Sequence, residues 1–230
     1  MKPILRTLAV LLLTMPVAVT AEDKGQAGDA ALSTNLQKFS YAIGLQIGES
    51  IKGKGIKLDP DALTTAITDV LKGNKQRLSN DELQKAVTAH ENEMSSDNLK
   101  AGDAFRAAFK KKAGVKELPG GVLYRVIKVG TGKSPSLDDV ISVNYSGKVI
   151  DGREFDNSDR HGGPVDLQLG KVIKGWQTAV TQMKEGGEWE IVVPPDLAYG
   201  EKGAGGVIGP NETLIFDIDL VKIKGPPANK

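Results

Sequence analysis

The sequence predicts an α+β protein, with an N-terminal all-α region that ends in a long connecting helix and a C-terminal antiparallel sheet wrapped around one short helix. Two observations carry this prediction. Up to about residue 112, apolar side chains recur at the three- and four-residue spacing of amphipathic helices. Beyond residue 118, apolar and polar residues alternate between turn residues, as in strands. A single helical segment among many strands is typical of a sheet that covers one helix.

The composition excludes several kinds of chemistry. The 230 residues contain no cysteine, so disulfides, thiolate nucleophiles and zinc–thiolate sites are excluded. The two histidines, His90 and His161, lie in different predicted elements, which argues against a histidine metal centre or a Ser-His-Asp triad. The formal charge of +1, without a basic stripe, argues against a nucleic-acid partner. We therefore expect a function that needs no metal and no cofactor.

Residues 1–21 have the pattern of a secretory signal peptide. Lys2 and Arg6 form a basic start, residues 8–19 are mostly apolar, and Val19-Thr20-Ala21 fits a small-residue cleavage site. A membrane anchor is the alternative, but a span needs about 20 apolar residues. An exported chain without cysteine suits a bacterial periplasm. Association with the outer membrane or the cell surface stays open.

A first helix is expected from Thr34 to the glycine-rich residues 52–55. Its apolar face comprises Leu36, Phe39, Ile43, Ile47 and Ile51. Gly44 and Gly48 lie on the same side. They weaken the helix by about 1 kcal/mol each relative to alanine, so we favour the interpretation that they allow another helix to approach closely.

Capping residues predict the next two helices. Asp59-Pro60 starts the second helix, with Asp as N-cap and Pro at the first helical position, and Gly73-Asn74 ends it. Ser79 followed by Glu82 forms a capping box for the third helix. Together these helices offer few apolar side chains for a core of their own, so we expect residues 34–94 of two chains to form a homodimer.

The third helix is expected to be long, because residues 80–112 contain no proline and one glycine. Its apolar residues form two stripes, Leu83, Val87, His90 and Met94, then Ala104, Phe105, Ala108 and Phe109. Residues 95–98 between the stripes are polar, which predicts a rod whose ends are packed and whose middle is not. The alternative is two helices broken near Asp97 or Gly102.

Strand patterns follow at residues 122–129, 140–146, 188–193 and 213–223, with one short helix at residues 173–183. Motifs lie along this part of the chain at residues 145–156 (Tyr-Ser-Gly to Glu-Phe-Asp), 170–176, 194–200 and 214–217. Their order and spacing over residues 118–224 resemble the FK506-binding-protein (FKBP) type of peptidyl-prolyl isomerase. Residues 34–117 are similar to the dimerisation arm and connecting helix of the exported bacterial Mip and FkpA branch.

The resemblance implies a domain plan and a set of partners. The expected domains are a signal peptide at 1–21, a helical dimerisation domain at 22–78, a connecting helix at 79–113 and an isomerase domain at 114–230. The implied substrates are unfolded or partly folded proline-containing proteins, and FK506- or rapamycin-like molecules are the implied inhibitors. The alternative function is a non-enzymatic dimeric chaperone or surface interaction protein that grips proline-containing segments.

Prolyl isomerisation requires few reactive groups in the enzyme. Rotation about an X–Pro amide crosses a barrier of about 18–20 kcal/mol because it breaks resonance. The twisted amide carries less charge separation than the planar one, so a dry apolar pocket favours it. No acid, base or nucleophile is obligatory.

The resemblance also assigns roles to residues in such a pocket. Trp176 would be the floor under the proline ring, and the walls would be Tyr145, Phe155 and Phe216. The N–H of Ile173 and the hydroxyl of Tyr199 would hold substrate carbonyls, and Asp156 would lie near the twisting carbonyl. Further substrate contacts are expected from Val165, Val172, Val207 and Ile208.

Three features depart from common family patterns. Arg160 and His161 stand where a basic residue often supports the aspartate, and the sequence leaves open which of them serves. Val165 replaces a wall residue that is often aromatic. The flap at residues 203–210 is short and has Ala204 where some members carry histidine. Nearby, Asn211-Glu-Thr fits a glycosylation sequon, which we interpret as chance.

Overall fold

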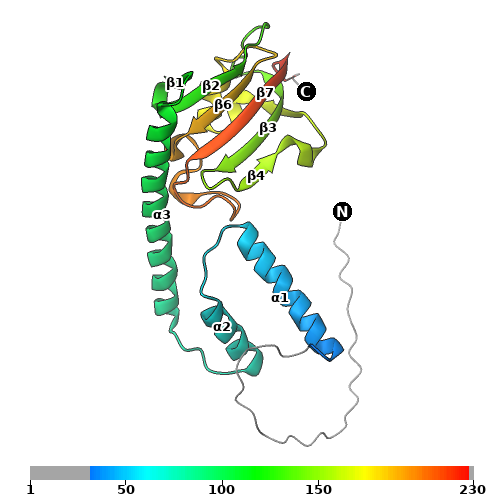
Figure 1. Ribbon diagram of the computed structural model, residues 1–230, viewed down its shortest axis with the longest axis vertical. Helices are drawn as coiled ribbons and strands as arrows, with labels where there is room; N and C mark the ends of the chain where they lie inside the picture. Colours follow the sequence, from blue (N-terminus) through cyan, green and yellow to red (C-terminus); the bar gives the residue numbers. More distant parts are fainter. Residues whose placement is uncertain (1–31, 228–230) are drawn as a thin grey trace, which may run out of the picture. The chain divides into compact units, whose positions relative to one another are not determined.

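A computed structural model describes residues 32–227 (Figure 1). The signal peptide expected at residues 1–21 lies outside the described residues. The chain comprises two compact units that divide within the first helix, between Leu45 and Gln46. None of the helices in the described part combines the length and hydropathy that a membrane span requires.

Helix α1, Asn35–Gly53, forms where the apolar stripe predicted it. None of its residues is buried, and Leu36 and Phe39 are 74% and 65% exposed. Nothing in the described residues lies within 4 Å of a Cβ built on Gly44 or Gly48. Among residues 32–227, the apolar face of α1 is therefore largely exposed.

The predicted caps of α2, Pro60–Lys72, are confirmed. The Asp59 carboxylate accepts a hydrogen bond of 2.8 Å from the N–H of Ala62. At the other end, Gly73 adopts a φ of 67°, the left-handed conformation that favours glycine and closes the helix.

Helix α3, Asn80–Lys110, is one continuous helix, so the break considered near Asp97 or Gly102 is absent. The predicted capping box is confirmed, since the N–H of Ser79 donates to the Glu82 carboxylate at 2.7 Å. The prediction of an unpacked middle is wrong. Gly102 is buried, and Ser95 and Asn98 are half-buried, because both hydrogen-bond to the C-terminal domain.

The C-terminal domain contains a seven-stranded antiparallel sheet, with the strand order β1-β2-β6-β7-β3-β4 and β5 paired with β3. The strands are β1 Val115–Leu118, β2 Val122–Lys128, β3 Val140–Val149, β4 Glu154–Asn157, β5 Val165–Gln168, β6 Glu188–Val193 and β7 Leu214–Gly225. Four of these were predicted. The three that were missed have four residues each, which is too short to show clear alternation.

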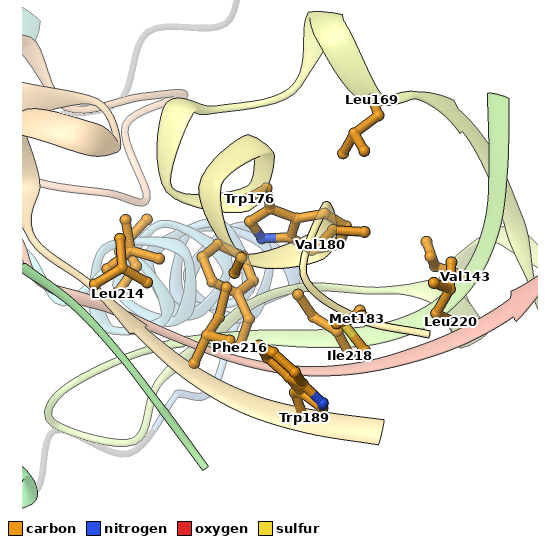
Figure 2. Close-up of a cluster of buried hydrophobic side chains, with 14 of the residues drawn as sticks. Val143, Leu169, Trp176, Val180, Met183, Trp189, Leu214, Phe216, Ile218 and Leu220 are labelled. Atoms are coloured by element: carbon orange, nitrogen blue, oxygen red, sulfur yellow. The ribbon is translucent and has the colours of Figure 1, made fainter. Parts of the chain in front are cut away.

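The main core lies between one face of the sheet and α4, Lys174–Val180 (Figure 2). Trp176 and Val180 of α4 are buried there, with Met183 just beyond the helix. The close approach depends on Gly175, because a Cβ at this position would overlap the side chain of Val193 on β6. The predicted α+β arrangement, with a sheet around one short helix, is confirmed.

The C-terminal end of α3 packs against the opposite face of the sheet. Its buried Phe109 contacts a cluster that contains Leu123 of β2 and Val192 of β6. The sequence neighbours of these two residues, including Val122 and Ile191, belong to the main core instead. Successive side chains of a strand point to opposite faces, so both α3 and α4 are anchored to the same strands.

Candidate active site

A cavity of about 240 Å³ opens where α4 meets β3, β4 and the loop after β6. Eight residues that the sequence assigned to the site line it together: Tyr145, Phe155, Asp156, Val172, Ile173, Trp176, Tyr199 and Phe216. They come from segments up to 71 positions apart in sequence (216 minus 145). The fold therefore assembles the motifs at one place.

The floor and two walls of the cavity are aromatic rings packed edge to face. Trp176 is 4% exposed, and its ring centroid lies 5.4 Å from those of Tyr145 and Phe216, at interplanar angles of 86° and 89°. Figure 2 shows Trp176 on α4 above the ring of Phe216. Phe155 meets Phe216 in the same way, at 5.7 Å. Such pairs contribute about 0.5–1.5 kcal/mol each beyond area burial, so the rings hold one another in place.

A glycine of β3 allows these rings to lie close to the sheet. A Cβ on Gly147 would come within 3 Å of the rings of both Phe155 and Phe216. Gly147 pairs with Asp156 on one side and with Phe216 on the other, and the register of β3 and β4 shifts next to it. Sequence reasoning did not single out this residue, although a glycine inside a strand often marks a close approach.

Asp156 forms the polar corner of the cavity. Its Oδ2 accepts a hydrogen bond of 2.6 Å from the Tyr145 hydroxyl, and its Oδ1 lies 3.1 Å from Nε2 of His161. Burial raises the pKa of Asp156, but the hydrogen bonds from Tyr145 and His161 outweigh burial and lower this pKa overall. The side chain is therefore a carboxylate at neutral pH.

The structure also decides between the two basic residues near Asp156. His161 contacts the carboxylate, whereas Arg160 turns away and donates to the carbonyl of Phe155 and to the carboxylate of Glu154, both at 3.1 Å. His161 is thus the residue that supports Asp156.

Two further groups in the cavity are positioned to donate hydrogen bonds. Burial and the charge of Asp156 raise the pKa of Tyr199, so its hydroxyl stays protonated at neutral pH. The N–H of Ile173, at the start of α4, points to no acceptor among residues 32–227. Within the same residues, no three His, Cys, Asp or Glu side chains are grouped to hold a metal ion.

Tyr199 reaches the cavity from a loop shaped by two prolines. Pro194 and Pro195 are buried, and their carbonyls accept hydrogen bonds from Leu197 at 3.1 Å and Ala198 at 2.9 Å. Gly200 follows with a φ of 57°. This tight turn at the end of β6 carries Tyr199 back over the cavity.

Three of the predicted contacts lie outside the cavity lining. Val165 is half-buried on β5, Val207 is half-buried in the flap, and Ile208 is buried in the main core at 7% exposure. Sequence reasoning missed Leu167 and Lys171, which do line the cavity. Leu167 lies two residues beyond Val165 and thus on the same face of β5.

Two family models match the chain. The family model described as "FKBP-type peptidyl-prolyl cis-trans isomerase" matches residues 132–221. A second model, "Domain amino terminal to FKBP-type peptidyl-prolyl isomerase", matches residues 36–126.

Relatives match over most of the chain. The chain is 38% identical to "Outer membrane protein MIP" of Legionella longbeachae, over 97% of this chain and 99% of that protein. It is 40% identical to "Peptidyl-prolyl cis-trans isomerase Mip" of Coxiella burnetii, over 84% and 89%. The crystal structure of FkpA from Escherichia coli is 35% identical and covers 86% of this chain and 100% of its own, with a TM-score of 0.59. The chain therefore belongs to the family of FKBP-type peptidyl-prolyl cis-trans isomerases, in its Mip and FkpA branch, and is an enzyme of that type.

Proposed function

We propose that the cavity over Trp176 isomerises X–Pro bonds in unfolded or partly folded exported proteins, without a cofactor. The observation that supports this most strongly is the set of mutually packed rings around a single carboxylate. Trp176 offers a flat, buried floor for a proline ring, and Tyr145, Phe155 and Phe216 enclose it.

The pocket acts by favouring the twisted amide. Water stabilises the planar amide, whose oxygen carries partial negative charge, better than it stabilises the twisted one. Aromatic walls replace that water. The carboxylate of Asp156, beside the rotating carbonyl, disfavours the charge-separated planar form further. Each 1.36 kcal/mol removed from the barrier accelerates the rotation tenfold.

Two donors hold the peptide while the bond rotates. The N–H of Ile173 and the hydroxyl of Tyr199 bind substrate carbonyls on either side of the reacting bond. Val172 contacts the proline ring, and Leu167 supplies the wall that had been expected from Val165. Val207 contacts the peptide from the flap, and FK506- or rapamycin-like molecules compete for the same cavity.

The N-terminal helices form a homodimer. The uncovered apolar face of α1, with Leu36 and Phe39 mostly exposed, supports burial against a second chain through residues 34–94. The domains of this proposal are a dimerisation domain at 22–78, a connecting helix at 79–113 and an isomerase domain at 114–230. Two pockets in one dimer would bind a client with two prolines more tightly than either pocket alone.

The chain is exported to the periplasm and acts on other exported proteins. The signal pattern of residues 1–21 supports export, as does the similarity to the outer membrane protein of Legionella longbeachae.

The proposed role of Trp176 is tested with two matched tryptophan variants. Trp189 is also buried but lies outside the cavity, where it stacks on Tyr124 with a centroid separation of 4.3 Å. We expect Trp176→Phe to lower kcat/KM on an X–Pro tetrapeptide about tenfold, roughly 1.4 kcal/mol, and Trp189→Phe to leave it unchanged. Full activity of a correctly folded Trp176→Phe protein would refute the mechanism. If the wild-type protein proves inactive on the tetrapeptide but suppresses aggregation, the non-enzymatic alternative is favoured.

A further inference from the structure

The polar middle of α3 docks on the loop that leads from the cavity back to β7. Asn211 is the centre of this contact. It is 5% exposed, and its amide donates a hydrogen bond of 2.8 Å to the hydroxyl of Ser95 on α3. Its backbone N–H donates to the carbonyl of Gly200, also at 2.8 Å. One residue thus connects the long helix to the neighbour of Tyr199.

Asn211 has an unusual backbone conformation. Its φ of 53° is the only positive φ of a non-glycine residue among residues 32–227. Asparagine tolerates the left-handed region better than most side chains, but the region remains unfavourable for it. The conformation directs the N–H toward Gly200 and the side chain toward Ser95, so both hydrogen bonds depend on it.

Neighbouring contacts hold the same loop against α3. The amide of Asn98 donates to the carbonyl of Pro210 at 2.8 Å, and the guanidinium of Arg106 donates to the hydroxyl of Thr213. Gly102 lies against Thr213 so closely that a Cβ would overlap its hydroxyl. The α3 residues of this contact recur every three or four positions and form one face, namely Ser95, Asn98, Gly102 and Arg106.

Contacts outside α3 also hold the loop, because the guanidinium of Arg153 donates to the carbonyl of Val207 and pairs with Glu212. Residues 194–213 lie between β6 and β7 and carry no strand of the main sheet. Within the loop, Ala204 and Ile208 form an isolated bridge, and Ile208 enters the core. The carbonyl of Gly200 accepts hydrogen bonds from the N–H of Gly203 at 3.3 Å and from the N–H of Asn211 at 2.8 Å, and only the second of these donors is bonded to α3, through Ser95.

We propose that Asn211 and Ser95 are positioning residues for the isomerase reaction, and that α3 fixes the Tyr199 hydroxyl over the cavity through them. This inference rests on the proposed function of Tyr199 as a donor to a substrate carbonyl. It makes α3 a functional part of the catalytic domain as well as the connection to the helical region.

The test uses full-length protein and a matched pair of serine variants. Ser95→Ala removes the hydroxyl that accepts from the side-chain amide of Asn211, whereas Ser96→Ala changes the exposed serine next to Ser95. We expect Ser95→Ala to lower kcat on an X–Pro tetrapeptide about threefold to tenfold with little change in KM. Ser96→Ala should match the wild type, and Ser95→Thr, which keeps a hydroxyl, should restore most of the rate. Asn211→Gly, which tolerates the positive φ, should resemble Ser95→Ala.

Two measurements separate positioning from a loss of stability. In a Tyr199→Phe background, Ser95→Ala should cause no further loss, because the group that it positions is gone. Hydrogen exchange of the backbone N–H of Asn211 should accelerate in Ser95→Ala and not in Ser96→Ala. Additive losses in the double variant would overturn the inference.

The remaining outcomes distinguish this inference from the proposed function. If Tyr199→Phe alone keeps full activity, the role proposed for Tyr199 is wrong, and the inference fails with it. If Tyr199→Phe loses activity while Ser95→Ala matches the wild type in both rate and exchange, only the inference is overturned.

Discussion

The hydroxyl of Tyr145 donates a 2.6 Å hydrogen bond to Oδ2 of Asp156, while the ring of Tyr145 packs edge-on against Trp176. One side chain thus joins the aromatic enclosure to the carboxylate. Burial, together with the hydrogen bond to Asp156 and its charge, raises the pKa of Tyr145, so the hydroxyl remains a donor over the working pH range. The orientation of the carboxylate therefore depends on a wall residue.

Removing the hydroxyl of Tyr145 should change both the isomerisation rate and the pKa of Asp156. Tyr145→Phe keeps the ring and deletes one of the two side-chain hydrogen bonds that lower the pKa of Asp156. We expect the pKa of Asp156 to rise and kcat/KM to fall about fivefold, roughly 1 kcal/mol. Carbon NMR of the carboxyl group and a prolyl isomerisation assay measure the two effects. Tyr124→Phe, whose ring stacks on Trp189 outside the cavity, is the control. An unchanged Asp156 pKa would contradict the prediction.

Asp156 should contribute to stability at neutral pH and lose that contribution in acid. Its pKa in the folded protein lies below the ordinary value of 3.8, so the unfolded chain takes up the proton first as the pH falls. The contribution is fully present well above pH 3.8 and is lost as the pH falls through and below that value. In urea unfolding between pH 7 and pH 3, the wild type should lose more stability than Asp156→Asn. Parallel pH profiles would rule this out.

Gly102 should be required for the docking of α3. An alanine at this position gains about 1 kcal/mol of helix propensity but overlaps Thr213, and overpacking typically costs about 1–3 kcal/mol. We expect Gly102→Ala to lower the free energy of unfolding. Thr213→Ala in the same chain removes the overlapping hydroxyl and should reduce that cost. A stabilised Gly102→Ala protein would show that the close approach is unimportant.

A partly buried ion pair ties the loop between β6 and β7 to the β3–β4 turn. Nη2 of Arg153 lies 3.3 Å from Oε1 of Glu212, and their side chains are 18% and 13% exposed. Because breaking a buried pair leaves one charge uncompensated, Glu212→Ala should destabilise the protein by about 3 kcal/mol, and Glu212→Gln, which keeps an acceptor, by less.

The exposed pair of Lys148 and Asp217 is the control for this prediction. These two groups lie 3.7 Å apart, with side chains 40% and 51% exposed. Asp217→Ala should cost less than about 1 kcal/mol. Equal losses at Glu212 and Asp217 in thermal or urea unfolding would show that burial adds nothing to the Arg153 pair.

The sequence by itself determined the local elements, and its motifs indicated most of the residues that line the cavity. Caps such as Asp59 and the Ser79–Glu82 box act between residues three positions apart, so their signal lies within a few letters of sequence. The resemblance to the FKBP type assigned eight residues that line the cavity, because each lies in a short segment that matches a motif of that family. The sequence pointed to Val165, whereas Leu167, two positions away on the same face, lines the cavity, since a strand of four residues indicates a face but not which residue reaches the cavity.

Only the tertiary structure decided what the polar middle of α3 does. Ser95 and Asn98 bind groups more than 110 positions away, and a hydrogen bond over that separation leaves no periodic trace along the helix. Asn211 resembled a chance sequon because its sequence shows neither its burial nor its positive φ. Apolar periodicity predicts which face of a helix or strand is buried. Polar contacts between distant segments depend instead on where the folded chain brings their atoms.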